Sequence, residues 1–191
     1  MKILVIDDTQ KNLDSAVKTL EGHDVTLCSS YDEAIILLRE RAVDEKGEPC
    51  YPGDADATKI PYWDVVLCDL LMPVGERTHG QGQQKYVGEE MPFGWSLGLT
   101  AAMRGAKYVA VASDVNHHDH PASAMLDGIC DHFFNIDGAK VLMTNVIYFV
   151  APSKKICGKC AYHCKNLCPE NGCCKSINGK DWGKILNRLL K

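Results

Sequence analysis

The sequence predicts an α/β fold in which a parallel sheet is covered by helices on both faces. Short aliphatic and β-branched runs alternate five times with helix-forming stretches along residues 1–150, and such alternation is typical of doubly wound parallel sheets. Hydrophobic residues make up 46% of the 191-residue chain, which is enough to build a buried core. A chain of this length is expected to hold about one domain with a small appendage.

The first strands are short apolar runs that end at acidic or turn residues. Lys2–Asp7 is β-branched and aliphatic, which is typical of a buried parallel strand. Thr9 is a candidate N-cap for the following helix, and Gly22 is expected to stop that helix. Asp24–Cys28 is predicted to be the second strand and Asp64–Cys68 the third.

One insertion is expected on each side of the third strand. Tyr31–Val43 is predicted to be an amphipathic helix. The loop at residues 45–62 follows it, because Glu45–Pro61 contains three prolines and two glycines. A second insertion is expected at residues 74–94, because Met72–Gly94 contains five glycines and has no helical or strand period. This second insertion would be a lid, a docking surface or a disordered decoration.

The second half of the chain continues the alternation of helix and strand. The expected elements are a helix at Trp95–Arg104, the fourth strand at Tyr108–Ala112, a helix at Pro121–Leu126, the fifth strand at Ile129–Phe134 and an apolar helix at Ala139–Phe149. Asp181–Leu190 has apolar residues at helical spacing and is expected to close the chain as a short helix.

Three acidic residues are expected to meet at one edge of the sheet. Asp7 and Asp8 end the first strand, and Asp69 ends the third. In a flavodoxin-like sheet of strand order 2-1-3-4-5 these strands are neighbours, and the chemistry collects at the carboxyl ends of the strands. Close carboxylates repel one another, and a hard cation such as Mg²⁺ relieves that repulsion. A cation beside a nucleophilic carboxylate is the arrangement that phosphoryl transfer uses, because the cation offsets charge on the phosphoryl oxygens.

Three motifs at these strand ends resemble the landmarks of receiver domains, the CheY-like family of response regulators. They are KILVIDD at residues 2–8, VVLCD followed by LLMP at residues 65–73, and the VAVAS run that ends at Ser113. Apart from the two insertions, the order and spacing of the motifs match across residues 1 to about 148. The resemblance therefore implies a receiver domain over residues 1–150.

The resemblance also implies roles for individual residues. Asp69 would accept the phosphoryl group. Asp8, Asp69 and the backbone carbonyl of Leu71 would bind Mg²⁺ directly, and Asp7 would act through water. Ser113 matches the hydroxyl residue that hydrogen-bonds the phosphoryl group and moves on activation.

One member of the receiver pattern is missing. Receivers place a Lys–Pro pair after the fifth strand, and that lysine forms a salt bridge with the phosphoryl group. The alignment puts Asn135 at the lysine position, and asparagine donates a hydrogen bond without a charge. His132 falls where receivers carry an aromatic switch residue, and Lys140 is five positions beyond Asn135. Phosphorylation of Asp69 would remain possible, but its coupling to a conformational change would be weakened.

A histidine-rich turn follows the fourth strand. His117, His118 and His120 are candidate ligands for Zn²⁺ or another borderline metal. They could also contact a phosphoryl group, because this loop is expected to border the acidic residues. The alternative is a solvated turn that begins the helix at Pro121.

Six of the ten cysteines fall within the eighteen residues from Cys157 to Cys174. In a reducing cytosol such a cluster indicates a metal site, and a four-thiolate Zn²⁺ site is the leading interpretation. The chosen ligands are Cys157, Cys160, Cys168 and Cys173, with Cys164, Cys174 and His163 as alternates. An iron–sulfur cluster is the alternative. Residues 151–191 are therefore expected to form a zinc-stabilised tail with a short helix.

Charge and hydropathy limit the function classes. The net charge of −4 argues against binding to nucleic acid or to an anionic membrane. No signal peptide and no apolar run of about 20 residues is found, so a cytoplasmic protein is expected.

The expected function is that of a stand-alone response regulator. Its partners would be a sensor histidine kinase or phosphotransfer protein and an output protein. Its only chemistry would be self-catalysed phosphorylation and dephosphorylation. The alternatives are a phosphorylation-independent binding or scaffold module and a metal-dependent phosphate hydrolase.

Overall fold

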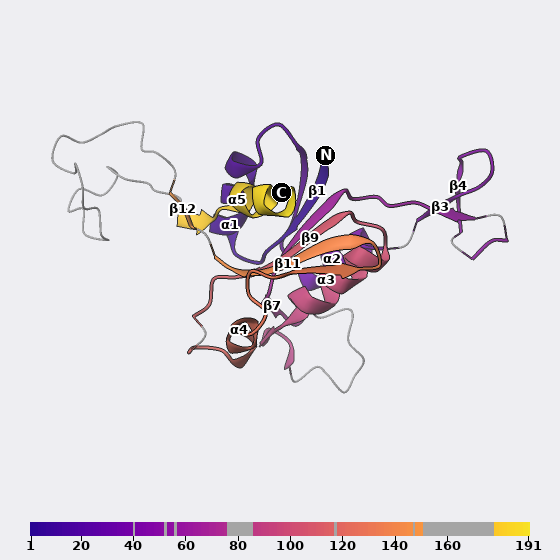
Figure 1. Cartoon of the computed structure of the whole chain (residues 1–191). Helices are drawn as coiled ribbons and strands as arrows, with labels where there is room; N and C mark the ends of the chain where they lie inside the picture. Colours follow the sequence, from indigo (N-terminus) through magenta and orange to yellow (C-terminus); the bar gives the residue numbers. More distant parts are fainter. Residues whose placement is uncertain are drawn as a thin grey trace.

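The central element of the computed structural model is a mostly parallel sheet (Figure 1). The structure describes residues 1–39, 41–51, 53–55, 57–75, 86–116, 118–146, 148–150 and 178–191. In spatial order the strands are β10 (Phe133–Ile136), β11 (Ala139–Asn145), β9 (Tyr108–Ser113), β6 (Val65–Asp69), β1 (Lys2–Ile6) and β2 (Asp24–Cys28). Neighbouring strands pair in parallel except β10, which pairs with β11 in the antiparallel sense. The predicted α/β class is therefore confirmed.

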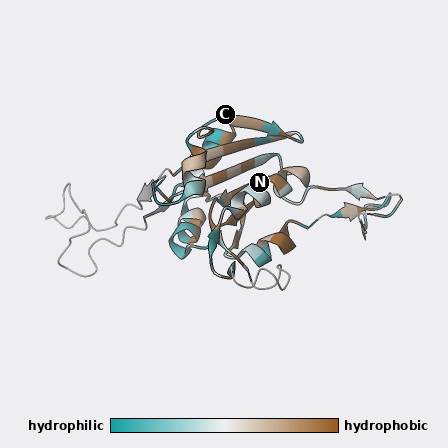
Figure 2. Cartoon of the chain, turned by 90° about the horizontal axis from the view of Figure 1, so that it is seen from below, coloured by the Kyte–Doolittle hydropathy of each residue, from teal (hydrophilic) through white to brown (hydrophobic). Residues whose placement is uncertain are grey.

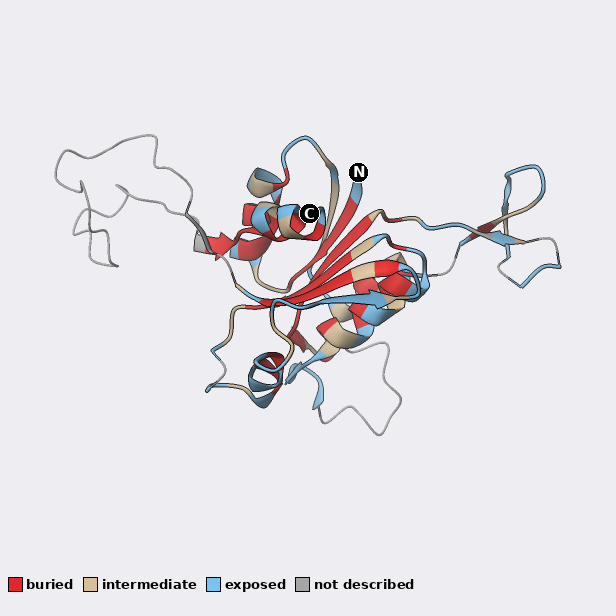
Figure 3. Ribbon diagram, in the orientation of Figure 1, coloured by how far each residue is buried: buried red, intermediate tan, exposed pale blue. Residues whose placement is uncertain are grey.

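Helices cover both faces of the sheet. Alternate strand residues enter two separate cores, as the period of two along a strand requires. The core on one face includes α1 (Gln10–Thr19) and α5 (Trp182–Leu189). The core on the other face includes α2 (Tyr31–Leu37), α3 (Phe93–Met103) and α4 (Pro121–Leu126). The strands between them are largely hydrophobic in Figure 2 and buried in Figure 3.

Several short strands lie outside the central sheet. One small sheet has the order β4 (Pro49–Cys50), β3 (Ala42–Val43), β5 (Thr58–Lys59), and it stands away from the central sheet in Figure 1. A second pair joins β7 (Met72–Pro73) to β8 (Glu90–Met91), and a third joins β12 (Tyr148–Val150) to β13 (Asn178–Lys180). Among the described residues, no helix has the length and hydropathy that a membrane crossing requires.

The helix predicted at Tyr31–Val43 ends six residues early, at Leu37. Ala42 and Val43 instead form β3, which pairs with β4 on one side and β5 on the other. The insertion predicted as loop supplies both partners, so long-range pairing overrides the local helical pattern here.

The elements predicted at Ile129–Phe134 and Ala139–Phe149 are wrong in type or position. The fifth parallel strand is β11 at Ala139–Asn145, where a helix was expected. Residues 133–136 form the antiparallel edge strand β10, and Asp137–Gly138 joins the two strands. Both turn residues have positive φ, 52° and 85°, as a two-residue hairpin turn requires. Because β11 is buried between β10 and β9, its run of apolar residues has no strand alternation to distinguish it from a buried helix.

The predicted C-terminal helix is confirmed as α5, and it belongs to the core. Asp181 caps it, its carboxylate accepting a hydrogen bond from the backbone N–H of Lys184 at 3.0 Å. The apolar face of α5 is buried, and the helix contacts α1, β9 and β11. The division of the chain at residue 150 stays a prediction, but the last helix shares one core with the N-terminal helix.

Candidate functional site

Three carboxylates meet at the carboxyl edge of the sheet. Asp7 and Asp8 directly follow β1, and Asp69 is the last residue of β6. One carboxylate oxygen from each lies within 4.8 Å of the others. Asp7 is fully buried and Asp69 is 5% exposed. The structure thus brings together the three acidic residues that the sequence analysis singled out.

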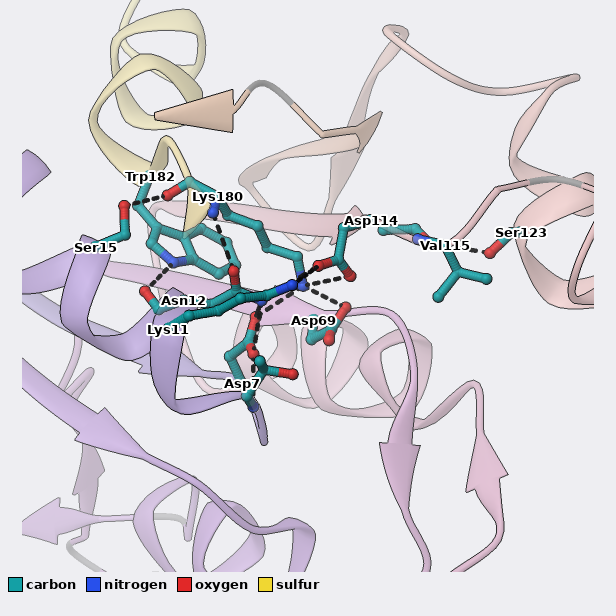
Figure 4. A network of polar contacts seen from close by, with 12 residues as sticks. Asp7, Lys11, Asn12, Ser15, Asp69, Asp114, Val115, Ser123, Lys180 and Trp182 are labelled. Carbon is teal, nitrogen blue, oxygen red and sulfur yellow. Dashed lines mark hydrogen bonds and ion pairs between the residues drawn. The ribbon is translucent and has the colours of Figure 1, made fainter. Parts of the chain in front are cut away.

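A buried lysine from the other end of the chain enters this group (Figure 4). The Nζ atom of Lys180 lies 2.7 Å from Asp7 Oδ2, 2.7 Å from Asp69 Oδ1 and 3.5 Å from Asp114 Oδ1. The Lys180 side chain is fully buried, and a buried ammonium group is tolerated only when it is paired in this way. Lys180 therefore supplies the positive charge that the acidic site requires.

The backbone of Lys180 is held by helix α1. Its N–H donates to Asn12 Oδ1 at 3.0 Å, and its carbonyl accepts from Ser15 Oγ at 2.7 Å. The preceding residue, Gly179, packs so closely on α1 that a Cβ there would lie 2.6 Å from the carbonyl oxygen of Lys11. Only glycine allows this approach, and β13 can therefore place Lys180 over the sheet edge.

Asn12 connects Lys180 to Asp7. Its Nδ2 lies 3.0 Å from both carboxylate oxygens of Asp7, while its Oδ1 accepts from Lys180 as described. The backbone carbonyl of Asn12 also accepts from Trp182 Nε1 at 3.1 Å. Asp7 accepts a further bond from the backbone N–H of Thr9 at 2.9 Å. Thr9 stands at the predicted N-cap position of α1, but its side chain makes no cap bond. These bonds fix Asp7 in one orientation.

Burial and charge shift the pKa values of the site. Burial raises the pKa of Asp69, the charge of Lys180 lowers it and that of Asp7 raises it again, and together these effects bring the pKa to about 8. Burial lowers the pKa of Lys180, but the negative charges of Asp69 and Asp7 outweigh that effect and raise it overall. Burial and the charge of Asp7 also raise the pKa of Asp8. A carboxyl group with a raised pKa retains its proton more readily unless a further cation offsets its charge.

Asp114 is a fourth carboxylate at the edge of the site. It directly follows Ser113, the last residue of β9. Besides its contact with Lys180, its Oδ2 lies 3.4 Å from Asn12 Nδ2 and 4.0 Å from Lys11 Nζ. No sequence motif pointed to Asp114.

Two other predicted residues of the phosphoryl site lie near Asp69, one on the neighbouring strand β9 and one two positions along the chain. Ser113 is buried at the end of β9, where its Oγ lies 2.9 Å from Ser123 Oγ on α4. Leu71 lies two residues beyond Asp69 and is buried. The backbone of Gly94 lies so close to that of Asp69 that any Cβ on Gly94 would overlap the Asp69 carbonyl oxygen. The first turn of α3 is therefore packed directly on the backbone of Asp69.

Asn135, predicted at the position of the missing lysine, is not at the site. It pairs with Lys140 in the β10–β11 hairpin, and Lys140 pairs with Tyr108, the first residue of β9. Ser113 ends the same strand, so Asn135 lies toward the opposite edge of the sheet. Its side chain is engaged locally, where Oδ1 accepts from the N–H of Gly138 at 3.2 Å. The misplaced fifth strand caused this error.

Two residues near Asn135 in the sequence, His132 and Lys140, do not supply the missing receiver groups either. His132, predicted at the aromatic switch position, is exposed in the loop before β10. The ammonium group of Lys140 lies over the ring of Phe133, 4.3 Å from its centroid.

The histidine-rich turn has a structural role in its described part. His120 caps α4, its Nδ1 accepting a hydrogen bond from the N–H of Ala122 at 3.1 Å. His118 is exposed, and its backbone N–H donates to Asn116 Oδ1 at 3.0 Å. No metal-binding group that includes a histidine occurs among the described residues, and His117 lies outside them.

The predicted zinc ligands all lie outside the described residues. This holds for Cys157, Cys160, Cys168 and Cys173 and for the alternates Cys164, Cys174 and His163. The four other cysteines are free thiols, and Cys28 and Cys68 are buried. Burial raises the pKa of Cys28 to about 12 and that of Cys68 still further, so neither is a reactive thiolate.

A sequence signal for Lys180 did exist. Lys180–Asp181 stands directly before the amphipathic helix that closes the chain, so this lysine could have been considered beside Asn135 and Lys140. The Asp137–Gly138 pair is likewise the sequence of a tight hairpin turn, and it would have moved the fifth strand to Ala139–Asn145. Asn12 carried no such signal, because its role depends on contacts with residues 168 positions away.

Comparison with known proteins yields one structural similarity. No protein-family model matches the sequence, and no curated protein matches it. Among solved structures, the beryllofluoride-activated DrrB receiver domain is similar, with 14% sequence identity and a TM-score of 0.36. The similarity covers 75% of this chain and 82% of that chain.

Proposed function

We propose that this protein is a response-regulator receiver in a phosphorelay, phosphorylated on Asp69. The observation that carries the proposal is the ammonium group of Lys180, 2.7 Å from Asp69 and from Asp7 in a buried acidic group. A nucleophilic carboxylate, acidic neighbours for a divalent cation and a fixed lysine are the groups that phosphoryl transfer needs. Lys180 takes the place that the sequence alignment assigned to Asn135.

Magnesium fits the donor set of this site. Hard cations prefer oxygen ligands, and Asp7, Asp8 and Asp69 offer three carboxylate oxygens within 4.8 Å of one another. By the receiver resemblance, Asp8, Asp69 and the backbone carbonyl of Leu71 would hold the ion, and Asp7 would act through water. When bound, the ion would offset negative charge on the phosphoryl oxygens.

The chain's own residues then have distinct parts in the transfer. A carboxylate oxygen of Asp69 attacks the phosphorus and forms an O–P bond, while the bond to the donor breaks and its electron pair leaves with the donor. Lys180 donates hydrogen bonds to the phosphoryl oxygens as their charge develops. Ser113, on the neighbouring strand β9, offers a hydroxyl donor. Water later attacks the phosphorus, the O–P bond to Asp69 breaks with its electron pair returning to the carboxylate, and inorganic phosphate leaves.

Acetyl phosphate tests this proposal directly. With Mg²⁺, we expect intact-mass spectrometry to show one added phosphoryl group on the wild-type protein and none on the Asp69→Asn variant. Asp64→Asn, which removes a carboxylate at the start of β6 rather than at its end, is the matched control and should still react. An unmodified wild-type protein, or equal modification of Asp69→Asn, would contradict the proposal.

The two alternative functions have less support than the receiver. The missing lysine and the long insertion suggested a phosphorylation-independent binding module, and Lys180 weakens the first of these two reasons. The acidic site and the histidines together suggested a metal-dependent phosphate hydrolase; His120 Nδ1 is engaged as a helix cap, which leaves the acidic site as the main support for that function. We therefore keep a histidine kinase or phosphotransfer protein as the upstream partner, protein–protein contact as the output, and the cytoplasm as the compartment.

A zinc site in the cysteine-rich segment remains part of the proposal. The segment joins β12 to β13, the strand that carries Lys180. We expect metal analysis of the purified protein to give about one zinc ion per chain. A double substitution of Cys157 and Cys160 by serine should remove it, and Cys50→Ser, at a cysteine outside the cluster, should not. Iron with sulfide would instead identify an iron–sulfur cluster, and absence of both would contradict a metal site.

A further inference from the structure

We propose that Asp114 tunes the affinities of the acidic site. Its carboxylate holds Lys180 in the unphosphorylated protein and disfavours the phosphorylated form. The inference rests on the proposed function, and it concerns how readily Asp69 accepts and keeps a phosphoryl group. Its basis is the competition of three carboxylates for one buried ammonium group (Figure 4).

Asp114 is the most weakly held of the three partners of Lys180. Its Oδ1 lies 3.5 Å from Lys180 Nζ, compared with 2.7 Å for each of the other two. The Asp114 side chain is 17% exposed, whereas that of Asp7 is fully buried and fixed by Asn12 and the N–H of Thr9. Asp114 is therefore the partner whose contact with Lys180 is most easily lost when another anion binds to Lys180.

Phosphorylation creates such an anion. The ester bond removes the charge of the Asp69 carboxylate, and the phosphoryl group adds a charge of about −1.5 to −2 at the same place. Lys180 then faces more negative charge than before, and Asp114 repels the phosphoryl group across the same gap. Lys11, whose Nζ lies 4.0 Å from Asp114 Oδ2 and is largely exposed, offers the displaced carboxylate a second cation.

The negative charge of Asp114, which repels a phosphoryl group, attracts a divalent cation. In the unphosphorylated protein, Asp114 adds negative potential beside Asp7, Asp8 and Asp69, which favours Mg²⁺. Removal of the charge should therefore weaken Mg²⁺ binding and strengthen phosphoryl binding. A residue with a merely structural role would weaken both when substituted.

The Asp114→Asn variant separates these effects, because it removes the charge and keeps the shape. Mg²⁺ affinity is measured by calorimetry on the unmodified protein. Affinity for beryllofluoride, which imitates the phosphoryl group, is measured at saturating Mg²⁺. We expect Mg²⁺ affinity to fall about fivefold and beryllofluoride affinity to rise about fivefold, as expected for a single partly exposed charge. Asp114→Glu restores the charge and should return both values toward the wild type.

Asp24→Asn is the matched control, since it removes one carboxylate at the exposed start of β2, and both affinities should stay at the wild-type values. If both affinities fall together in Asp114→Asn, or neither changes, the inference is wrong while the proposed function stands. If the wild-type protein binds Mg²⁺ but no beryllofluoride, the proposed function fails and the inference fails with it.

Discussion

At the scale of single residues, the site depends on one cation buried among carboxylates. Lys180 lies within 2.7 Å of Asp7 and Asp69, and no part of its side chain is exposed. Removal of one partner from such a group leaves a buried charge uncompensated, which is far more costly than the loss of an exposed ion pair. The pKa values of Asp69 and Lys180 therefore depend on each other.

The pKa of Asp69 is the first prediction at this scale. In Mg²⁺-free buffer we expect its carboxyl group to titrate near pH 8, because burial raises its pKa from the ordinary 3.8 more than Lys180 lowers it. Lys180→Met removes the lowering charge, so the pKa of Asp69 should rise further. Carbon-13 NMR of the aspartate carboxyl groups measures both, with Asp69→Asn identifying the resonance. Titration of Asp69 near its ordinary value would contradict this electrostatic account.

At the scale of elements, the first and last helices form one unit that carries the site. Gly179 and Gly183 lie four residues apart, and a Cβ on either would meet a backbone carbonyl of α1, that of Lys11 or Thr19. Trp182 between them is buried and donates to the carbonyl of Asn12. This close packing brings β13 onto α1 and so brings Lys180 to the carboxyl edge of the sheet.

Gly179→Ala tests that packing. The new methyl group would lie 2.6 Å from the Lys11 carbonyl oxygen, and helix backbone cannot yield, so β13 and Lys180 should move outward. We expect a loss of about 1–3 kcal/mol in the free energy of unfolding, measured by urea denaturation, with weaker beryllofluoride binding. Gly128→Ala is the control, because no atom lies within 4 Å of a Cβ there. Wild-type stability in Gly179→Ala would show that the contact is unimportant.

At the scale of the whole molecule, the sequence was sufficient for the α/β class and for the carboxylates, but not for the lysine. Alternation of strand and helix and acidic residues at strand ends are local patterns, and they correctly placed Asp7, Asp8 and Asp69 together. The fifth strand was misplaced because β11 is a buried apolar run without alternation. The contact between Lys180 and Asp7 spans 173 positions and the cysteine-rich segment lies between them, so the place of Lys180 before the last helix was a weak signal that the alignment did not use.

In the proposed mechanism Lys180, and not Asn135, acts on the phosphoryl group at Asp69. The most direct test compares beryllofluoride affinity at saturating Mg²⁺ for Lys180→Gln and Asn135→Ala, with circular dichroism to verify that both variants are folded. We predict a loss of about tenfold or more for Lys180→Gln, because a charge-assisted hydrogen bond is replaced by a neutral one, and wild-type affinity for Asn135→Ala. Unchanged affinity in Lys180→Gln, or a loss confined to Asn135→Ala, would contradict the account.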